Sequence, residues 1–298
     1  MASRFTANGA ILADYSAPLG FTNPHIQSVL ARISLRRRIM FRRAQQVLEL
    51  SESVDVVLED GVHLRGYYSP VAAPSKGLVI FIHGWEGSAD SQYVLSAARE
   101  LHAKGYEIFR LNLRDHGGTA HLNEELFHSC RIDEIVAAVR WVTQRYTAPR
   151  YFLAGFSLGG NFSLRVAARA PKAGINLDRV IAVCPVLSPA NTMLALEQGA
   201  WIYRYHFLTK WRRSLSAKAE AFPGLYDFGD LRRLATLTAT TDYFVQFHTP
   251  FPSLDAYLNG YALVDDALAQ LEVPAKIVLA SDDPVIPIED LPRVAKSG

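Results

Sequence analysis

The sequence predicts an α/β protein in which helices cover both faces of a mostly parallel central sheet. Short β-rich runs alternate with amphipathic helical segments along most of the chain, a spacing typical of parallel sheets. The run at 77–82 is apolar throughout, as expected for a strand that is buried on both faces. With 298 residues, of which 49% are hydrophobic, the chain is long enough to bury a large core.

Local patterns justify the individual elements. Asp60-Gly61 separates two β-rich runs and predicts a hairpin at the start of the sheet. Val94, Ala98 and Leu101 recur at helical spacing, and Gly105 is placed to end that helix. The predicted strands are 54–59, 63–68, 77–82, 106–113, 150–155, 179–184 and 275–280. Further helices are predicted at 132–142 and 161–170.

The stretch between Cys184 and Val273 breaks this alternation. It is rich in aromatic residues, because 12 of the 32 in the chain fall between Trp201 and Phe251. A helical subdomain with its own core and a lid over an apolar pocket are compatible interpretations. The predicted organisation is therefore a lead-in segment at 1–50, the α/β core at 51–189, a helical lid insertion at 190–252 and the C-terminal part of the core at 253–298.

The lead-in segment contains a basic stretch at 34–46. Its cationic residues are Arg36, Arg37, Arg38, Arg42 and Arg43. One interpretation is a patch for a membrane surface or an acidic partner. The other is a solvated helix whose Leu35, Ile39 and Phe41 pack inward, and the net charge of only +2 for the whole chain favours it.

Composition excludes several classes of protein. Lys and Arg number 31 against 29 Asp and Glu, which argues against a nucleic-acid-binding protein. Cys130 and Cys184 are too few for a disulfide framework and predict reduced thiols in a cytoplasmic protein. Residues 1–21 lack the apolar core of a signal peptide, and 181–196 contains too many polar residues and prolines for a membrane-spanning helix.

The strongest sign of chemistry is Gly155-Phe156-Ser157-Leu158-Gly159-Gly160, which matches the pattern G-x-S-x-G. This pattern places a serine on a sharp strand-to-helix turn, the nucleophile elbow, where its hydroxyl is exposed. A strand is predicted directly before the motif and a helix directly after it. This context favours Ser157 as a nucleophile over an ordinary glycine-rich turn.

A second motif, His83-Gly84-Trp85-Glu86-Gly87-Ser88, follows the buried strand at 77–82. Acyl transfer builds negative charge on the carbonyl oxygen, and this charge needs two preorganised donors. We expect the backbone N–H groups of Leu158 and Trp85 to supply them. His83 precedes the serine in the chain, and we expect it to bond the loop rather than to act as the base.

A third motif, Asp282-Asp283-Pro284-Val285-Ile286-Pro287, follows the last predicted strand. A carboxylate at this place would orient a catalytic base and stabilise its imidazolium. Asp283 is the candidate because it begins the turn that Pro287 closes, whereas Asp282 is placed to bond the backbone. The alternative is a turn that is merely capped by an aspartate.

Together these motifs resemble the YheT-like branch of the α/β-hydrolases over nearly the whole chain. The segments that carry the resemblance are 23–28, 83–94, 155–161 and 282–287, in that order. The resemblance implies the α/β-hydrolase fold and a serine carboxylesterase or lipase-like enzyme that acts on small-molecule acyl esters without metal or cofactor. It supports Ser157 as nucleophile and Asp283 as acid. Trp85 replaces a smaller apolar residue common in that family, which would alter access to the pocket.

The catalytic histidine of such an enzyme is missing from this chain. The triad of the fold runs Ser, Asp, His, yet all nine histidines precede Asp283. The last strand and its histidine turn are therefore expected to be absent, and turnover to be impaired. A shortened product of a complete esterase explains this loss of a whole block better than a natural binding or scaffold protein does. His116 and His248 are the candidate substitutes, neither of them favoured, and thioesterase chemistry stays open.

Overall fold

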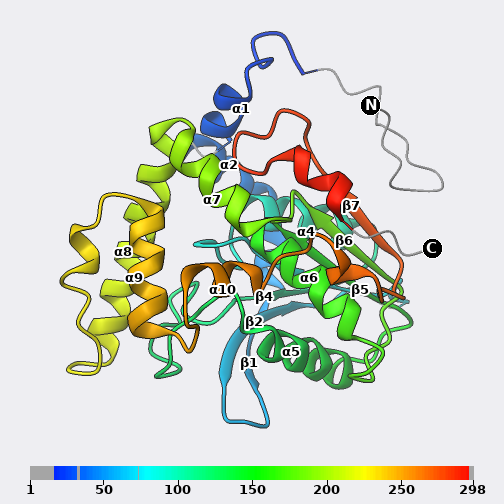
Figure 1. Ribbon diagram of the computed structural model, residues 1–298. Helices are drawn as coiled ribbons and strands as arrows, with labels where there is room; N and C mark the ends of the chain where they lie inside the picture. Colours follow the sequence, from blue (N-terminus) through cyan, green and yellow to red (C-terminus); the bar gives the residue numbers. More distant parts are fainter. Residues whose placement is uncertain (1–16, 32–33, 73, 295–298) are drawn as a thin grey trace.

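The computed structural model describes residues 17–31, 34–72 and 74–294 (Figure 1). Residues 1–16, on which the expected absence of a signal peptide mostly rests, and residues 295–298 lie outside the described residues. The predicted fold class is confirmed: seven strands form one sheet in the order β1-β2-β4-β3-β5-β6-β7. The strands are β1 Glu52–Val57, β2 His63–Ser69, β3 Leu78–Ile82, β4 Glu107–Leu111, β5 Tyr151–Phe156, β6 Arg179–Val183 and β7 Ala275–Val278.

The sheet is mixed at one edge and parallel elsewhere. The hairpin of β1 and β2 is antiparallel, with Val54 opposite Gly66, and β2 is also antiparallel to β4. From β4 through β3, β5 and β6 to β7, neighbouring strands are parallel. The carboxyl ends of these five strands therefore meet at one edge, where ligand sites of open α/β sheets form.

Two helical layers cover the sheet because the central strands are apolar on both faces. Ile80 and Ile82 of β3 belong to the large core that includes α5 (Ile132–Arg145) and α6 (Leu158–Arg169). Val79 and Phe81 point to the other face and pack with Val94 and Ala98 of α4 (Gln92–Ala103). Side chains along a strand alternate between faces, so one strand feeds both layers.

Between β6 and β7 the chain forms a group of helices beside the sheet. They are α7 Pro189–Gln198, α8 Trp201–Ala221, α9 Leu237–His248 and α10 Leu254–Asn259. Figure 1 shows α8 and α9 side by side, to the left of the sheet. Trp211 of α8, Phe244 of α9 and Phe228 from the segment between them are buried in a separate apolar cluster, which also includes Leu126 from the loop after β4. The segment between β6 and β7 is therefore largely helical, and its role as a lid stays a prediction.

The N-terminal helices correct one expectation. They are α1 Pro24–Leu30, α2 Ser34–Arg43 and α3 Gln45–Glu49. Leu35 and Ile39 do not pack inward but are 61% and 43% exposed. The side of the segment that faces the core is occupied instead by Ala44 and Val47, which are buried, and by the partly buried Phe41. The end of the lead-in segment is therefore part of the core, while most of α2 is not.

Candidate active site

Ser157 occupies the corner between β5 and α6. Its backbone angles, φ 53° and ψ −120°, lie in a region that residues with a side chain rarely adopt. Two glycines permit the corner. A Cβ on Gly155 would lie 2.1 Å from the carbonyl oxygen of Gly159, and one on Gly159 would lie 2.3 Å from the carbonyl oxygens of Ile82 and His83. Because these glycines lack a Cβ, the start of α6 can pack directly against the backbone at the ends of β3 and β5. Ser157 is thereby held partly exposed at the carboxyl end of β5.

Two backbone N–H groups beside the corner are free. Among the described residues, neither Leu158 N nor Trp85 N donates a hydrogen bond to a protein acceptor. The loop after β3 lies against the serine, because a Cβ on Gly84 would be 3.2 Å from Ser157 Cβ. The N–H of Leu158 also begins α6, whose dipole favours negative charge there. The two amides expected to bind an oxyanion thus come from the two segments that meet at Ser157.

His83 is part of the framework of this loop. Its side chain is fully buried; Nδ1 lies 2.7 Å from the carbonyl oxygen of Gly84, and Nε2 accepts from the amide N–H of Leu113 at 3.1 Å. Burial, followed by the proximity of His116, lowers the pKa of His83 to about 3. Both ring nitrogens are engaged and the ring stays neutral, so His83 has the contacts of a residue that shapes the turn.

Asp283 follows β7 at the same edge of the sheet. Its Oδ1 accepts from the backbone N–H groups of Val285 and Ile286, at 2.9 and 3.1 Å. Cys184 links it to the serine corner: the N–H of Cys184 donates to Val278 O of β7, and that of Ser157 donates to Val183 O of β6. Burial and the nearby Asp283 carboxylate raise the pKa of the Cys184 thiol to about 11. Asp283 therefore lies two strands from Ser157, with its Oδ1 committed to its own turn.

None of the nine histidines, all of them among the described residues, has a recorded hydrogen bond to Ser157 or Asp283. The two candidate substitutes are occupied elsewhere. His116 Nδ1 lies 2.7 Å from Arg114 O, and its Nε2 accepts from Glu86 N at 3.2 Å. His248 of α9 sits among aromatic rings, the nearest being Phe228 at 5.1 Å between centroids. The structure therefore places a serine and two amides at one corner and a carboxylate two strands away, and none of the described histidines is hydrogen-bonded to the serine or the carboxylate.

Comparison with known proteins decides the family. The profile described as alpha/beta hydrolase fold matches residues 77–297. The chain belongs to the alpha/beta hydrolase fold family. "Putative esterase YheT" of Escherichia coli (strain K12) is 24% identical over 287 residues, covering 94% of this chain and 81% of that protein. "Protein abhd-3.2" of Caenorhabditis elegans is 24% identical over 220 residues, covering 73% of this chain but only 58% of that protein. The predicted resemblance to the YheT-like branch is thus confirmed.

Solved structures agree on the fold of this hydrolase. The esterase Pf2001 of Pyrococcus furiosus has a TM-score of 0.52 at 16% identity, covering 81% of this chain and 74% of that one. The serine hydrolase CCSP0084 of Cycloclasticus zankles has a TM-score of 0.54 at 14% identity, covering 83% of this chain and 88% of that one. Identities this low establish the shared architecture and nothing finer.

Trp85 joins the hydrolase core to α8. Its ring stacks on Phe207 of α8, with centroids 5.3 Å apart and planes inclined by 8°, and meets Trp211 edge-on at 5.3 Å. The next residue, Glu86, is held from the same helix: Lys210 Nζ donates to its carbonyl oxygen at 2.8 Å, and Ser214 Oγ donates to its Oε2 at 2.6 Å. Residues on successive turns of α8 thus hold the loop that carries the Trp85 amide.

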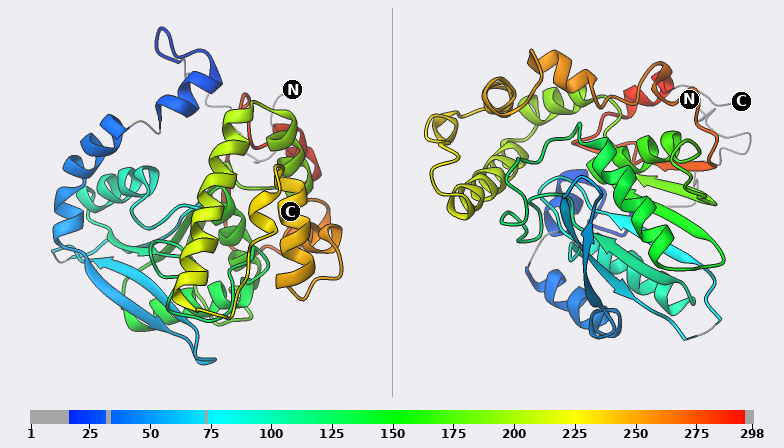
Figure 2. Two further views of the ribbon diagram at one scale, coloured as in Figure 1. Left: turned by 90° about the vertical axis from the view of Figure 1, so that its left-hand side faces the viewer. Right: turned by 90° about the horizontal axis from the view of Figure 1, so that it is seen from below.

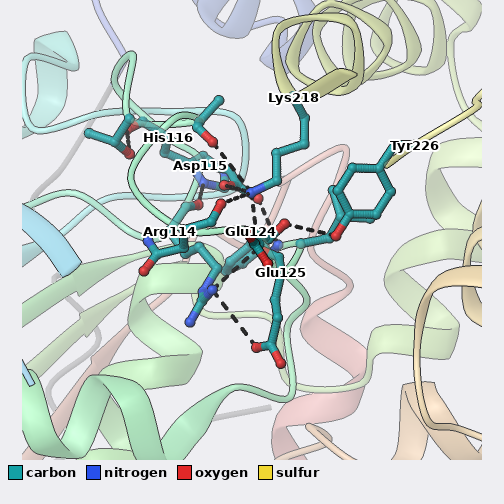
Figure 3. A network of polar contacts seen from close by, with 12 residues as sticks. Arg114, Asp115, His116, Glu124, Glu125, Lys218 and Tyr226 are labelled. Atoms are coloured by element: carbon teal, nitrogen blue, oxygen red, sulfur yellow. Dashed lines mark hydrogen bonds and ion pairs between the residues drawn. The ribbon is translucent and has the colours of Figure 1, made fainter. Parts of the chain in front are cut away.

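A buried ion pair, which the sequence did not reveal, anchors the far end of α8 (Figure 3). Lys218 is 1% exposed, and its Nζ lies 2.8 Å from Asp115 Oδ1 in the loop after β4. The same ammonium donates to the carbonyl oxygens of Asn123 and Glu125 at 2.6 and 3.0 Å. Burial lowers the pKa of Lys218, whereas Asp115 opposes that shift. The only hint in the sequence was that Asp115 comes shortly after a predicted strand.

Three further findings concern metal ions, cysteines and membrane-spanning helices. Within the described ranges, no three His, Cys, Asp or Glu side chains are grouped so that they could hold a metal ion, and both cysteines are free. No helix in the part of the chain that the structure describes is long and apolar enough to cross a membrane.

Proposed function

We propose that this protein is a serine ester hydrolase that works through an acyl-enzyme on Ser157. The observation that carries the proposal is the strained, partly exposed Ser157 with two unpaired backbone amides, those of Leu158 and Trp85, beside it. The names of the relatives and of the structural neighbour Pf2001 point to esterases as well. The aromatic residues of α8 that contact Trp85 favour small-molecule esters with an apolar acyl group.

The reaction would proceed in two transfers. Ser157 Oγ attacks the ester carbonyl carbon, and the charge that develops on the carbonyl oxygen is stabilised by the N–H groups of Leu158 and Trp85. The bond to the alkoxide breaks, and the proton of the serine ends on the departing alcohol. Water then attacks the acyl-enzyme, which restores the serine hydroxyl and releases the carboxylic acid.

Proton transfer is the weak step of this scheme. Asp283 is placed to orient a base, yet none of the nine histidines is hydrogen-bonded to it or to Ser157. We therefore propose that the 298-residue chain turns esters over slowly. Removal of one member of a catalytic triad typically leaves about 10³- to 10⁴-fold acceleration over water, from the oxyanion site and substrate binding.

Turnover of p-nitrophenyl acetate by the chain and by Ser157→Ala tests the proposal. We expect slow turnover that depends on Ser157 and that added imidazole accelerates, because free imidazole can act as the general base for Ser157. Imidazole also cleaves this ester in solution. The relevant quantity is therefore the rate increase that imidazole causes with the unmodified protein minus the increase that it causes with Ser157→Ala. Turnover that is equal in both proteins at every imidazole concentration would refute the nucleophile. Fast turnover without imidazole would refute the missing base.

The absence of an imidazole beside Asp283 also favours a second candidate, a ligand-binding or scaffold protein on the same fold. A fluorophosphonate probe separates the two. The hydrolase hypothesis predicts covalent labelling at Ser157, absent in Ser157→Ala and faster with imidazole. If the probe never labels Ser157 while an apolar ester still binds without being cleaved, the second candidate holds. Parallel assays with p-nitrophenyl thioacetate measure the preference between esters and thioesters.

A further inference from the structure

Charge is distributed unevenly along the chain. Residues 15–48 contain six arginines and no acidic residue, although the whole protein has a net charge of only +2. The remainder of the chain is consequently acidic. All five arginines of α2 have exposed side chains: Arg36, Arg37, Arg38, Arg42 and Arg43. None of the five takes part in an ion pair among the described residues.

Large apolar side chains are exposed among these arginines. Leu35 and Ile39 are four residues apart and share one face of α2. Further exposed apolar residues precede them in the chain: Leu19, Phe21, Ile26 and Val29. We call these six residues and the five arginines of α2 the N-terminal surface. The five arginines and two exposed apolar residues of α2 occupy one short helix, and apolar side chains exposed together are typical of an interaction site.

The N-terminal surface lies beside the first turn of the lid. Nδ1 of His25 in α1 lies 3.0 Å from the hydroxyl oxygen of Tyr203 in α8. Figures 1 and 2 both show α1 next to the region where α7 leads into α8. Trp201 and Tyr205 of that first turn are 67% and 63% exposed. Aromatic side chains with a polar atom are the type enriched where an apolar phase meets water.

We propose that the N-terminal surface docks on the surface of a lipid bilayer that contains anionic lipids. The arginines pair with lipid phosphates, and Leu35, Ile39 and the apolar residues of α1 enter the region between headgroups and acyl chains. The proposal does not depend on catalysis by Ser157. Charge complementarity and interleaved apolar side chains support it together, because a nucleic acid would match the arginines but would offer no apolar layer to Leu35 and Ile39.

Flotation of the full chain with vesicles tests this docking. We expect the protein to float with vesicles of phosphatidylcholine and phosphatidylglycerol, to float much less with phosphatidylcholine alone, and to be released by salt. Equal partition into both kinds of vesicle, or none into either, would overturn the proposal. So would tight binding to RNA without binding to anionic vesicles. These measurements use the unmodified protein and so remain decisive even if a variant misfolds.

Charge reversal locates the contact. Arg36→Glu with Arg38→Glu should lower partition into anionic vesicles by at least about 20-fold, because each basic residue near such a surface changes binding severalfold. The matched control is Lys172→Glu with Arg179→Glu, an equal change in charge at exposed residues outside the N-terminal surface. We expect the control to retain at least half of the binding. Equal loss in both variants would mean that net charge alone, and not this surface, is responsible.

Removal of the apolar side chains separates docking from simple ion pairing. Leu35→Ser with Ile39→Ser should weaken vesicle binding at least about 10-fold without changing the helical content in circular dichroism. Leu225→Ser with Phe247→Ser removes apolar residues of similar exposure elsewhere and should leave binding unchanged. If the first pair binds vesicles as the unmodified protein does, apolar insertion is refuted.

Discussion

The two sides of the candidate active site are built very differently. On the nucleophile side, Ser157 sits where backbone touches backbone, and α6 behind it is almost entirely buried. On the acid side, Asp283 follows β7, a four-residue edge strand whose first two residues are exposed. The carboxylate is held by hydrogen bonds to its own turn and has no imidazole beside it.

The difference shows that the serine corner is held rigidly by the fold, whereas the carboxylate is held only by its own turn. The nucleophile side is fixed by contacts that many residues share, so the corner, the amide of Leu158 and the loop of Trp85 persist without substrate. The acid side is formed by local hydrogen bonds at the margin of the sheet. Substitutions on the nucleophile side should therefore cost far more stability than substitutions on the acid side.

The largest effect is expected for Gly159→Ala. The new Cβ would lie 2.3 Å from two backbone carbonyl oxygens, which cannot move without displacing β3. We expect a loss of more than about 4 kcal/mol in the free energy of unfolding, measured by urea denaturation. Gly160→Ala is the matched control, because its Cβ would meet Pro185 Cβ at 3.1 Å and the carbonyl oxygen of Gly155 at 3.2 Å, distances that small shifts can relieve. Similar losses in the two variants would contradict the tight backbone packing that defines this side.

The second largest effect is expected for Lys218→Met. It should lower the free energy of unfolding by about 3 kcal/mol, because it leaves the buried Asp115 carboxylate without its cation. Asp115 has φ 63°, a conformation that asparagine tolerates. Asp115→Asn added to Lys218→Met removes the stranded charge and should recover part of the loss. The readout is again urea denaturation. If the double variant is less stable than Lys218→Met, the ion pair does not anchor α8 in the way its geometry implies.

Lowering the pH should decrease the free energy of unfolding, because His83, in the loop beside Ser157, is buried in its neutral form. Its folded-state pKa of about 3 lies below the ordinary value of 6.5, so the unfolded chain binds the extra proton first. Stability is then complete above about pH 6.5 and declines as the pH falls towards 3, by about 2 to 3 kcal/mol at pH 4.5. His83→Gln should flatten the plot of unfolding free energy against pH by this amount.

The control for this titration is His121→Gln, at an exposed histidine, which should keep the slope of the unmodified protein. Because the comparison concerns slopes, an overall destabilisation of His83→Gln does not obscure it. If that variant is too unstable to study, the ring of His83 can be followed by NMR in the unmodified protein. A pKa for His83 near 6.5 would contradict the buried, neutral ring.

Sequence reasoning succeeded where a feature is determined locally. The glycines around Ser157 and the apolar run of β3 constrain their own neighbourhoods, so the corner, the sheet and the family followed from short segments. Lys218 and Asp115 are 103 residues apart, and nothing in the sequence near either residue announces the other. Their pairing depends on how α8 packs over the loop after β4, which only the folded chain defines.

The outward position of Leu35 and Ile39 was mispredicted for a related reason. The apolar pattern of α2 is short, and it was assigned to the core on the assumption that apolar side chains face inward. The place against α4 is taken by neighbouring residues, including the buried Val47, which packs with Val94 and Ala98, and Leu35 and Ile39 remain exposed. Periodicity shows that residues share a face, but not which surface that face meets.

The smallest effect is expected for Asp283→Asn, and it tests the acid side directly. The amide oxygen of asparagine can accept the same two hydrogen bonds from Val285 and Ile286, so the unfolding free energy should change by less than about 1 kcal/mol. Turnover of p-nitrophenyl acetate without imidazole should change less than about threefold, since no base awaits orientation. With imidazole, the carboxylate gains a partner to orient, and the rescue by imidazole should fall at least about tenfold in the variant. A large loss of turnover without imidazole would show that Asp283 already serves a base, and the contrast between the two sides would then disappear.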